Sequence, residues 1–105
     1  MARSSNRDEE GEIISAALGN KRSILLAHHG QLCACKTVEE AAVLSLHIER
    51  AARLQLLAMS AGTIQDIDPE HARAAHDYRL KPKPLGATFH YYARQVLRID
   101  PDCLK

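Results

Sequence analysis

The order of apolar and polar positions predicts a short helix followed by two short strands. Apolar residues recur at helical spacing over residues 9–18, and Gly19 follows as a helix stop. Residues 23–27 form a continuous apolar run of strand length, which predicts a strand covered on both faces. Gly30 permits a tight turn, and the weak alternation over residues 31–35 predicts an antiparallel partner strand.

The longest apolar stretch predicts a helix over residues 38–60. Thr37 is a typical N-cap residue, and Glu40, three positions later, completes a capping box. Gly62 follows as a stop in the left-handed conformation. Apolar side chains occur on nearly every side of this helix, so we expect it to be buried on more than one side.

The remaining segments predict two further helices and a disordered start. Pro69 lies in the first turn of a predicted helix that runs to about Leu80. Residues 81–84 read Lys-Pro-Lys-Pro, which predicts an extended break, and residues 88–97 predict a last helix. Residues 1–8 are polar and are predicted to be disordered.

Composition narrows the class of protein. With 105 residues, 46% of them hydrophobic and 26% charged, the chain is one globular domain or part of one. A net charge of +1 gives no electrostatic reason to expect nucleic acid or an anionic membrane as partner. No apolar run approaches the roughly 20 residues of a membrane span. Three cysteines cannot all pair within one chain, so we expect free thiols and a cytoplasmic protein.

Two sets of residues near the turn are candidates for metal chemistry. His29 ends the first strand beside a glycine, and imidazole is the commonest metal-binding side chain near neutral pH. One histidine is not a metal site, so a histidine satisfied by hydrogen bonds at a turn is the alternative. His28, His29, Cys33 and Cys35 have ligand types that suit zinc, but their spacing matches no known zinc motif. Small cysteines that pack as apolar side chains are the alternative there.

The stretch from the apolar run to the long helix resembles a known family. Its successive parts are a leucine-rich strand, His29-Gly30, a short strand, Lys36-Thr37, Glu39-Glu40-Ala41 and Ile48-Glu49-Arg50-Ala51-Ala52. Over residues 9–62 this pattern is similar to the class II aldolase/adducin family. The ending Arg98-Ile99-Asp100-Pro101 also resembles the common ending of that family.

The resemblance implies a fold and a metal ligand. The fold is α/β: the carboxy-terminal part of a three-layer α/β/α domain, with two strands, a long buried helix and shorter helices. After the disordered start over residues 1–8, it implies a partial domain over residues 9–105. In the family, a His-x-His pair and the histidine of the His-Gly turn hold a divalent metal, which polarises a carbonyl or enediolate oxygen. The resemblance therefore implies that His29, and not His28, is a metal ligand, with zinc as the expected metal.

The chain departs from the family pattern at the rest of the metal site. No His-x-His occurs anywhere in the sequence. A catalytic zinc needs about three protein ligands, which one histidine cannot supply. We therefore expect an incomplete site in this chain, and no catalytic acid or base is assigned.

A cluster of aromatic residues near the end is a candidate for substrate contact. Phe89, Tyr91 and Tyr92 are three of the four aromatic residues of the chain, and His90 lies among them. In the family the tail often lies near the active site of a neighbouring subunit, which implies substrate contact by His90, Tyr91 and Tyr92. A hydrophobic anchor for the tail is the alternative. His47, on the long helix, is expected at an interface or on the surface.

Two functions of different classes fit these observations. The first is a metal-dependent aldolase-like lyase, present as a truncated chain that lacks most of the active site. It would cleave or decarboxylate a small hydroxy acid, oxo acid or sugar-derived substrate. The second is a non-catalytic module for interaction or oligomerisation, adducin-like or vestigial. In both cases an exposed sheet edge and apolar helix surface predict a homo-oligomer.

Overall fold

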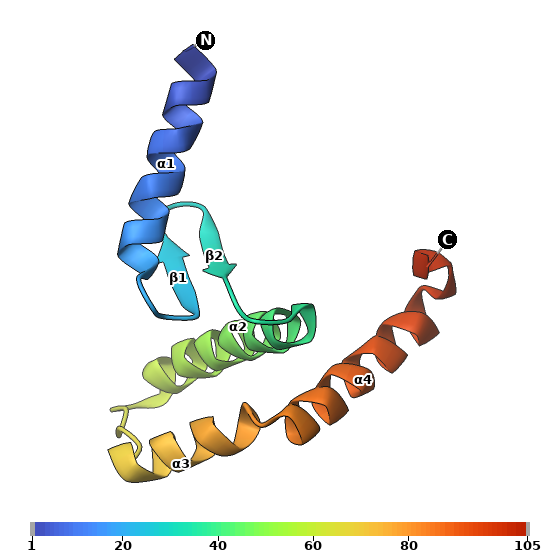
Figure 1. Ribbon diagram of the computed structural model, residues 1–105. Coiled ribbons are helices and arrows are strands. Elements are labelled where there is room, and N and C mark those ends of the chain that lie inside the picture. The colour runs from blue at the N-terminus through green and yellow to red at the C-terminus, as the bar shows by residue number, and fades with distance from the viewer. Residues whose placement is uncertain (1, 105) are drawn as a thin grey trace. The chain divides into compact units, whose positions relative to one another are not determined.

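The computed structural model describes residues 2–104, with side chains from residue 8 onward. Its elements, shown in Figure 1, are α1 (Ala2–Leu18), β1 (Ser23–Leu26), β2 (Gly30–Cys33), α2 (Val38–Ala61), α3 (Pro69–Arg79), α4 (Pro82–Ile99) and the 3-10 helix η1 (Pro101–Leu104). The α/β class, with two strands, a long helix and shorter helices, is confirmed. The chain forms two compact units that divide between Cys35 and Lys36. One partial domain over residues 9–105 stays a prediction.

Helix α1 is longer than the sequence predicts. It begins at Ala2 and not at Glu9, so residues 2–8 have a helical backbone where we expected disorder. These residues include no glycine or proline, and alanine and arginine are good helix formers, so the helix continues through them. Its end is as predicted: Gly19 has a left-handed φ of 56°, and its amide donates to the carbonyl of Ser15 at 3.0 Å.

Strands β1 and β2 form the predicted antiparallel hairpin. Leu26 pairs with Gly30, which leaves residues 27–29 as the turn, and the amide of His29 donates to the carbonyl of Leu26 at 3.1 Å. Gly30 has a φ of 137°, a backbone conformation that residues with a side chain rarely adopt, so glycine is favoured there. His28 also has a positive φ, 64°, which is uncommon for a residue with a side chain.

The apolar segments that form β1 and α2 are both less buried than the sequence predicts. Leu25 of β1 is 77% exposed, so the prediction of a strand covered on both faces is wrong. In α2 only Glu40 and Val43 are buried, so burial on more than one side is also wrong. An element buries only the face that another element covers, and within the second unit α2 is covered by α4. The predicted apolar surface on the long helix is confirmed, with Leu54 61% and Leu57 68% exposed.

Helix α2 begins and ends where the sequence predicts. The Thr37 hydroxyl accepts a hydrogen bond from the amide of Glu40 at 3.1 Å, which confirms the N-cap. At the other end the amide of Gly62 donates to the carbonyl of Ala58 at 3.2 Å. The φ of Gly62 is 163°, which is extended backbone, so the predicted left-handed stop is wrong in its conformation.

Helix α4 begins earlier than predicted. Residues 81–84 are not an extended break, because α4 starts at Pro82 and includes Pro84. The first amides of a helix have no partner within it, so a proline there removes no hydrogen bond, and its fixed φ suits a helix. Helix α3 has the predicted start at Pro69, where the Asp68 carboxylate accepts from the amide of Glu70 at 3.0 Å.

The second unit has a very small core. Helix α4 contacts α2, α3 and η1, and among the described residues Val43 and Leu85 are the buried apolar side chains, at 5% and 9% exposure. An apolar groove of about 440 Å³ lies between α2, α4 and η1, with Leu46, Val96 and Leu104 in its lining. No helix in the described part of the chain is long and apolar enough to cross a membrane.

Candidate functional site

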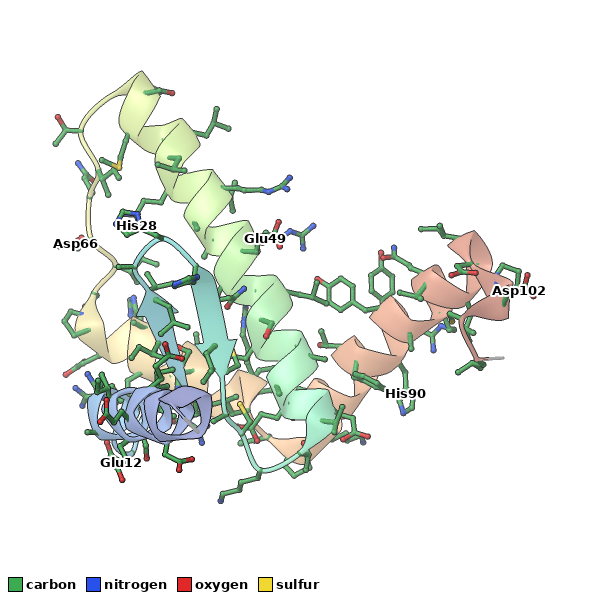
Figure 2. The ribbon with its side chains drawn as sticks, turned by 90° about the horizontal axis from the view of Figure 1, so that it is seen from above. Glu12, His28, Glu49, Asp66, His90 and Asp102 are labelled. Atoms are coloured by element: carbon green, nitrogen blue, oxygen red, sulfur yellow. The ribbon has the colours of Figure 1, made fainter. Side chains whose placement is uncertain are left out.

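His29 lies at the end of the hairpin turn. Its side chain is exposed, and its backbone is held by the hydrogen bond to Leu26. His28, the residue before it, lies at the same turn and is exposed as well (Figure 2). The hairpin therefore presents two neighbouring imidazoles to solvent, on a backbone shaped by the positive φ of His28 and Gly30.

The described residues do not form a complete metal centre. In the part of the chain with described side chains, no three histidine, cysteine, aspartate or glutamate side chains are arranged to hold a metal ion. The zinc site considered for His28, His29, Cys33 and Cys35 is therefore not assembled. A catalytic zinc needs about three protein ligands, so the described residues do not form such a site on their own.

The three residues predicted to contact substrate lie in different surroundings. His90 points away from α2 and is exposed, with its ring centroid 5.7 Å from that of Phe89 (Figure 2). Tyr91 is 51% exposed, and its hydroxyl accepts from the side-chain amide of Gln95 at 2.9 Å. Tyr92 lines two grooves of the second unit, one beside Arg50 and one between α2, α4 and η1. A substrate role for His90, Tyr91 and Tyr92 stays a prediction.

Tyr92 joins α4 to α2. Nη1 of Arg50 lies 3.4 Å from the Tyr92 hydroxyl oxygen, to which it donates. The ring of His47, one turn earlier on α2, meets the Tyr92 ring edge-on with centroids 6.3 Å apart. These contacts support the alternative interpretation of the aromatic segment, in which a tyrosine anchors the tail to the rest of the protein.

A shallow groove lies beside this contact. It measures about 290 Å³ and is lined by Leu46, Glu49, Arg50, Arg53 and Tyr92. Glu49, labelled on α2 in Figure 2, forms an ion pair with Arg53 at 3.0 Å. Both partners are mostly exposed, with 79% of the arginine and 58% of the glutamate side chain accessible, so this pair is held loosely.

The pKa of His47 is lowered, which the sequence alone does not indicate. Partial burial lowers the pKa of His47 below its usual value of 6.5, and the positive charges of Arg79 and Arg50 lower it further. The spacing of His47 and Arg50 indicates one helix face, but nothing local in the sequence places Tyr92 or Arg79 beside that face. Their approach depends on the packing of α3 and α4.

The lowered pKa of His47 predicts a pH dependence of stability. Just below pH 6.5 the unfolded chain binds a proton at His47 that the folded chain does not. We therefore expect the free energy of unfolding to fall as the pH drops below 6.5, and to level off below the folded pKa. Urea midpoints from about pH 5 to about pH 8 measure this change. His47→Gln should reduce this slope, and equal slopes in the wild type and in His47→Gln would contradict the prediction.

A comparison with known protein families identifies the family of this chain. The model of the class II aldolase and adducin N-terminal domain matches residues 2–56, just over half of the 105 residues. The match includes α1, the hairpin with His29 and the larger part of α2, and it extends further upstream than the predicted resemblance. Two parts of the predicted resemblance stay predictions. They are the family-like ending at residues 98–101 and the assignment of the chain to the carboxy-terminal part of the domain. No curated protein is similar enough in sequence to count as a match. The family match shows that this chain belongs to the class II aldolase and adducin family.

Proposed function

We propose that this chain contributes one metal ligand, His29, to a metal-dependent aldolase-like lyase. The observation that carries the proposal is that the family match includes the hairpin, at whose end His29 is exposed. The other ligands would come from outside the described residues, a second copy of the chain included, since no group of three possible ligands is assembled within them. Zinc is the proposed metal because imidazole is among its usual ligands.

The proposed reaction class follows from the family and not from a substrate pocket. It is aldol cleavage or decarboxylation of a small hydroxy acid, oxo acid or sugar-derived molecule. We also propose a reducing, cytoplasmic location. In support, none of Cys33, Cys35 and Cys103 forms a disulfide within the part of the chain that is described.

A non-catalytic interaction module is the second candidate, and one observation favours it. Val43 and Leu85 are the buried apolar side chains of the described chain, whereas many large apolar side chains are mostly exposed. Exposed apolar surface of this extent is typical of an interface. A second copy of the chain is the proposed partner, so the protein would act by self-association.

Paramagnetic broadening by Co²⁺ in NMR spectra of the full chain tests the first proposal. Co²⁺ accepts imidazole ligands as zinc does, and each of the six histidine rings gives its own signals. We expect the His29 ring to broaden at the lowest Co²⁺ concentration, and His29→Ala to abolish this early step. His28→Ala, the adjacent histidine of the same turn, is the matched control and should keep it. Equal broadening of all six rings would favour the interaction module.

A further inference from the structure

The groove at Arg50, Arg53 and Tyr92, called the Arg50 groove below, has the chemistry of an anion site. We propose that the Arg50 groove binds a small oxyanion, namely a phosphate or carboxylate group of a small molecule. The site involves neither His29 nor a metal, so it stands or fails independently of the proposed lyase function.

The donors of the groove are available to a ligand. Arg50 is exposed, and Nη1 of its guanidinium donates a long hydrogen bond of 3.4 Å to the Tyr92 hydroxyl. A guanidinium has five N–H donors in a planar fork that matches carboxylate and phosphate oxygens. Arg53 is engaged by Glu49, but both side chains are largely exposed, and a surface pair of this kind is easily exchanged for another anion.

The local charge is positive. Two arginines and one carboxylate line the groove, and the carboxylate already neutralises Arg53. Arg79 on α3 adds a further positive charge close enough to act on His47. An anion in the groove would offset the charges of Arg50 and Arg79 and remove part of their unfavourable effect on the imidazolium of His47.

The dimensions favour a small ligand. A volume of about 290 Å³ lies at the low end of pockets that hold small molecules. The lining is mixed, with Leu46 and the Tyr92 ring beside the charged groups, so a short carbon skeleton with one or two anionic groups fits its chemistry.

The test follows the His47 ring by NMR in the full chain while inorganic phosphate, succinate or chloride is added at constant ionic strength. The positive charges of Arg50 on α2 and Arg79 on α3 act on His47, and its ring contacts that of Tyr92 on α4. A bound anion should raise the pKa of His47 in a saturable manner. Tighter binding of phosphate would identify a phosphate ligand, and tighter binding of succinate a carboxylate ligand. If neither exceeds chloride, the proposal is overturned.

Three variants separate specific binding of an anion from general electrostatic attraction. Arg50→Gln should weaken anion binding about tenfold or more, because it removes a charged donor. Arg94→Gln on α4, an exposed arginine outside the groove, should leave binding unchanged. Arg50→Lys keeps the charge without the planar fork and should lie between the wild type and Arg50→Gln. Equal loss in Arg50→Gln and Arg94→Gln, with unchanged circular dichroism, would show a diffuse charge effect and overturn the site.

Discussion

Leu85→Ala should unfold the second unit at a much lower urea concentration than the wild type. Leu85 is 9% exposed, and with Val43 it makes up the buried apolar core of the described residues. Truncating a buried leucine to alanine costs about 2–5 kcal/mol, with the upper end reached where the cavity cannot collapse. We expect about 2–3 kcal/mol, since α4 is free to shift toward α2 over so small a core. Even this is a large part of the marginal stability of a small unit.

Urea unfolding followed by far-ultraviolet circular dichroism measures the effect. Leu104→Ala is the matched control, because Leu104 is 81% exposed and the same atoms are removed. A surface change of this kind should alter stability by less than about 0.5 kcal/mol. Equal losses at Leu85 and Leu104 would mean that the small core does not hold the helices together.

Leu54→Glu combined with Leu57→Glu should prevent the self-association that we propose for this chain. The two leucines lie three positions apart on one face of α2 and are 61% and 68% exposed. We expect this face to be buried in the self-associated protein, where two carboxylates would be desolvated without partners. A loss of affinity on the order of 100-fold follows if the two charges cost a few kcal/mol together.

Sedimentation velocity over a range of protein concentrations measures the association. Val38→Glu is the control, since Val38 is 78% exposed but lies at the start of α2, far along the helix from Leu54 and Leu57. A glutamate is tolerated in the first turn of a helix. The wild type and Val38→Glu should associate alike, and the double variant should remain monomeric. A wild type that is monomeric at every concentration would refute the self-association proposal.

The elements of the fold are largely predictable because their signals are local. The Thr37 cap, the turn at Gly30 and the stop at Gly19 each depend on a few neighbouring residues. The predicted break at Pro82 and Pro84 is wrong because the effect of proline depends on its position. Proline disrupts a helix in its interior but is well tolerated in the first turn. Burial could not be predicted, because the apolar pattern of α2 does not reveal which of its faces another element covers.

For the candidate sites too, the features with local sequence signals are predictable and the long-range contacts are not. His29 was identified from a contiguous motif, and its exposure at the turn is a local property of the hairpin. The contact of Arg50 with Tyr92 joins residues 42 positions apart, and no local signal in one sequence indicates such a pair. His47 was for this reason expected to be an ordinary surface or interface residue, although α3 and α4 bring charge and an aromatic ring to it.

A thermal melt with and without zinc tests most directly the proposal that His29 is a metal ligand. At a zinc concentration 100 times the dissociation constant, a site present only in the folded protein adds about 2.7 kcal/mol. Circular dichroism at protein concentrations that favour association should then show a higher midpoint for the wild type and for His28→Ala. His29→Ala should melt at the same temperature with and without zinc. A midpoint that zinc leaves unchanged in the wild type, or raises equally in His29→Ala, would contradict the assignment of His29.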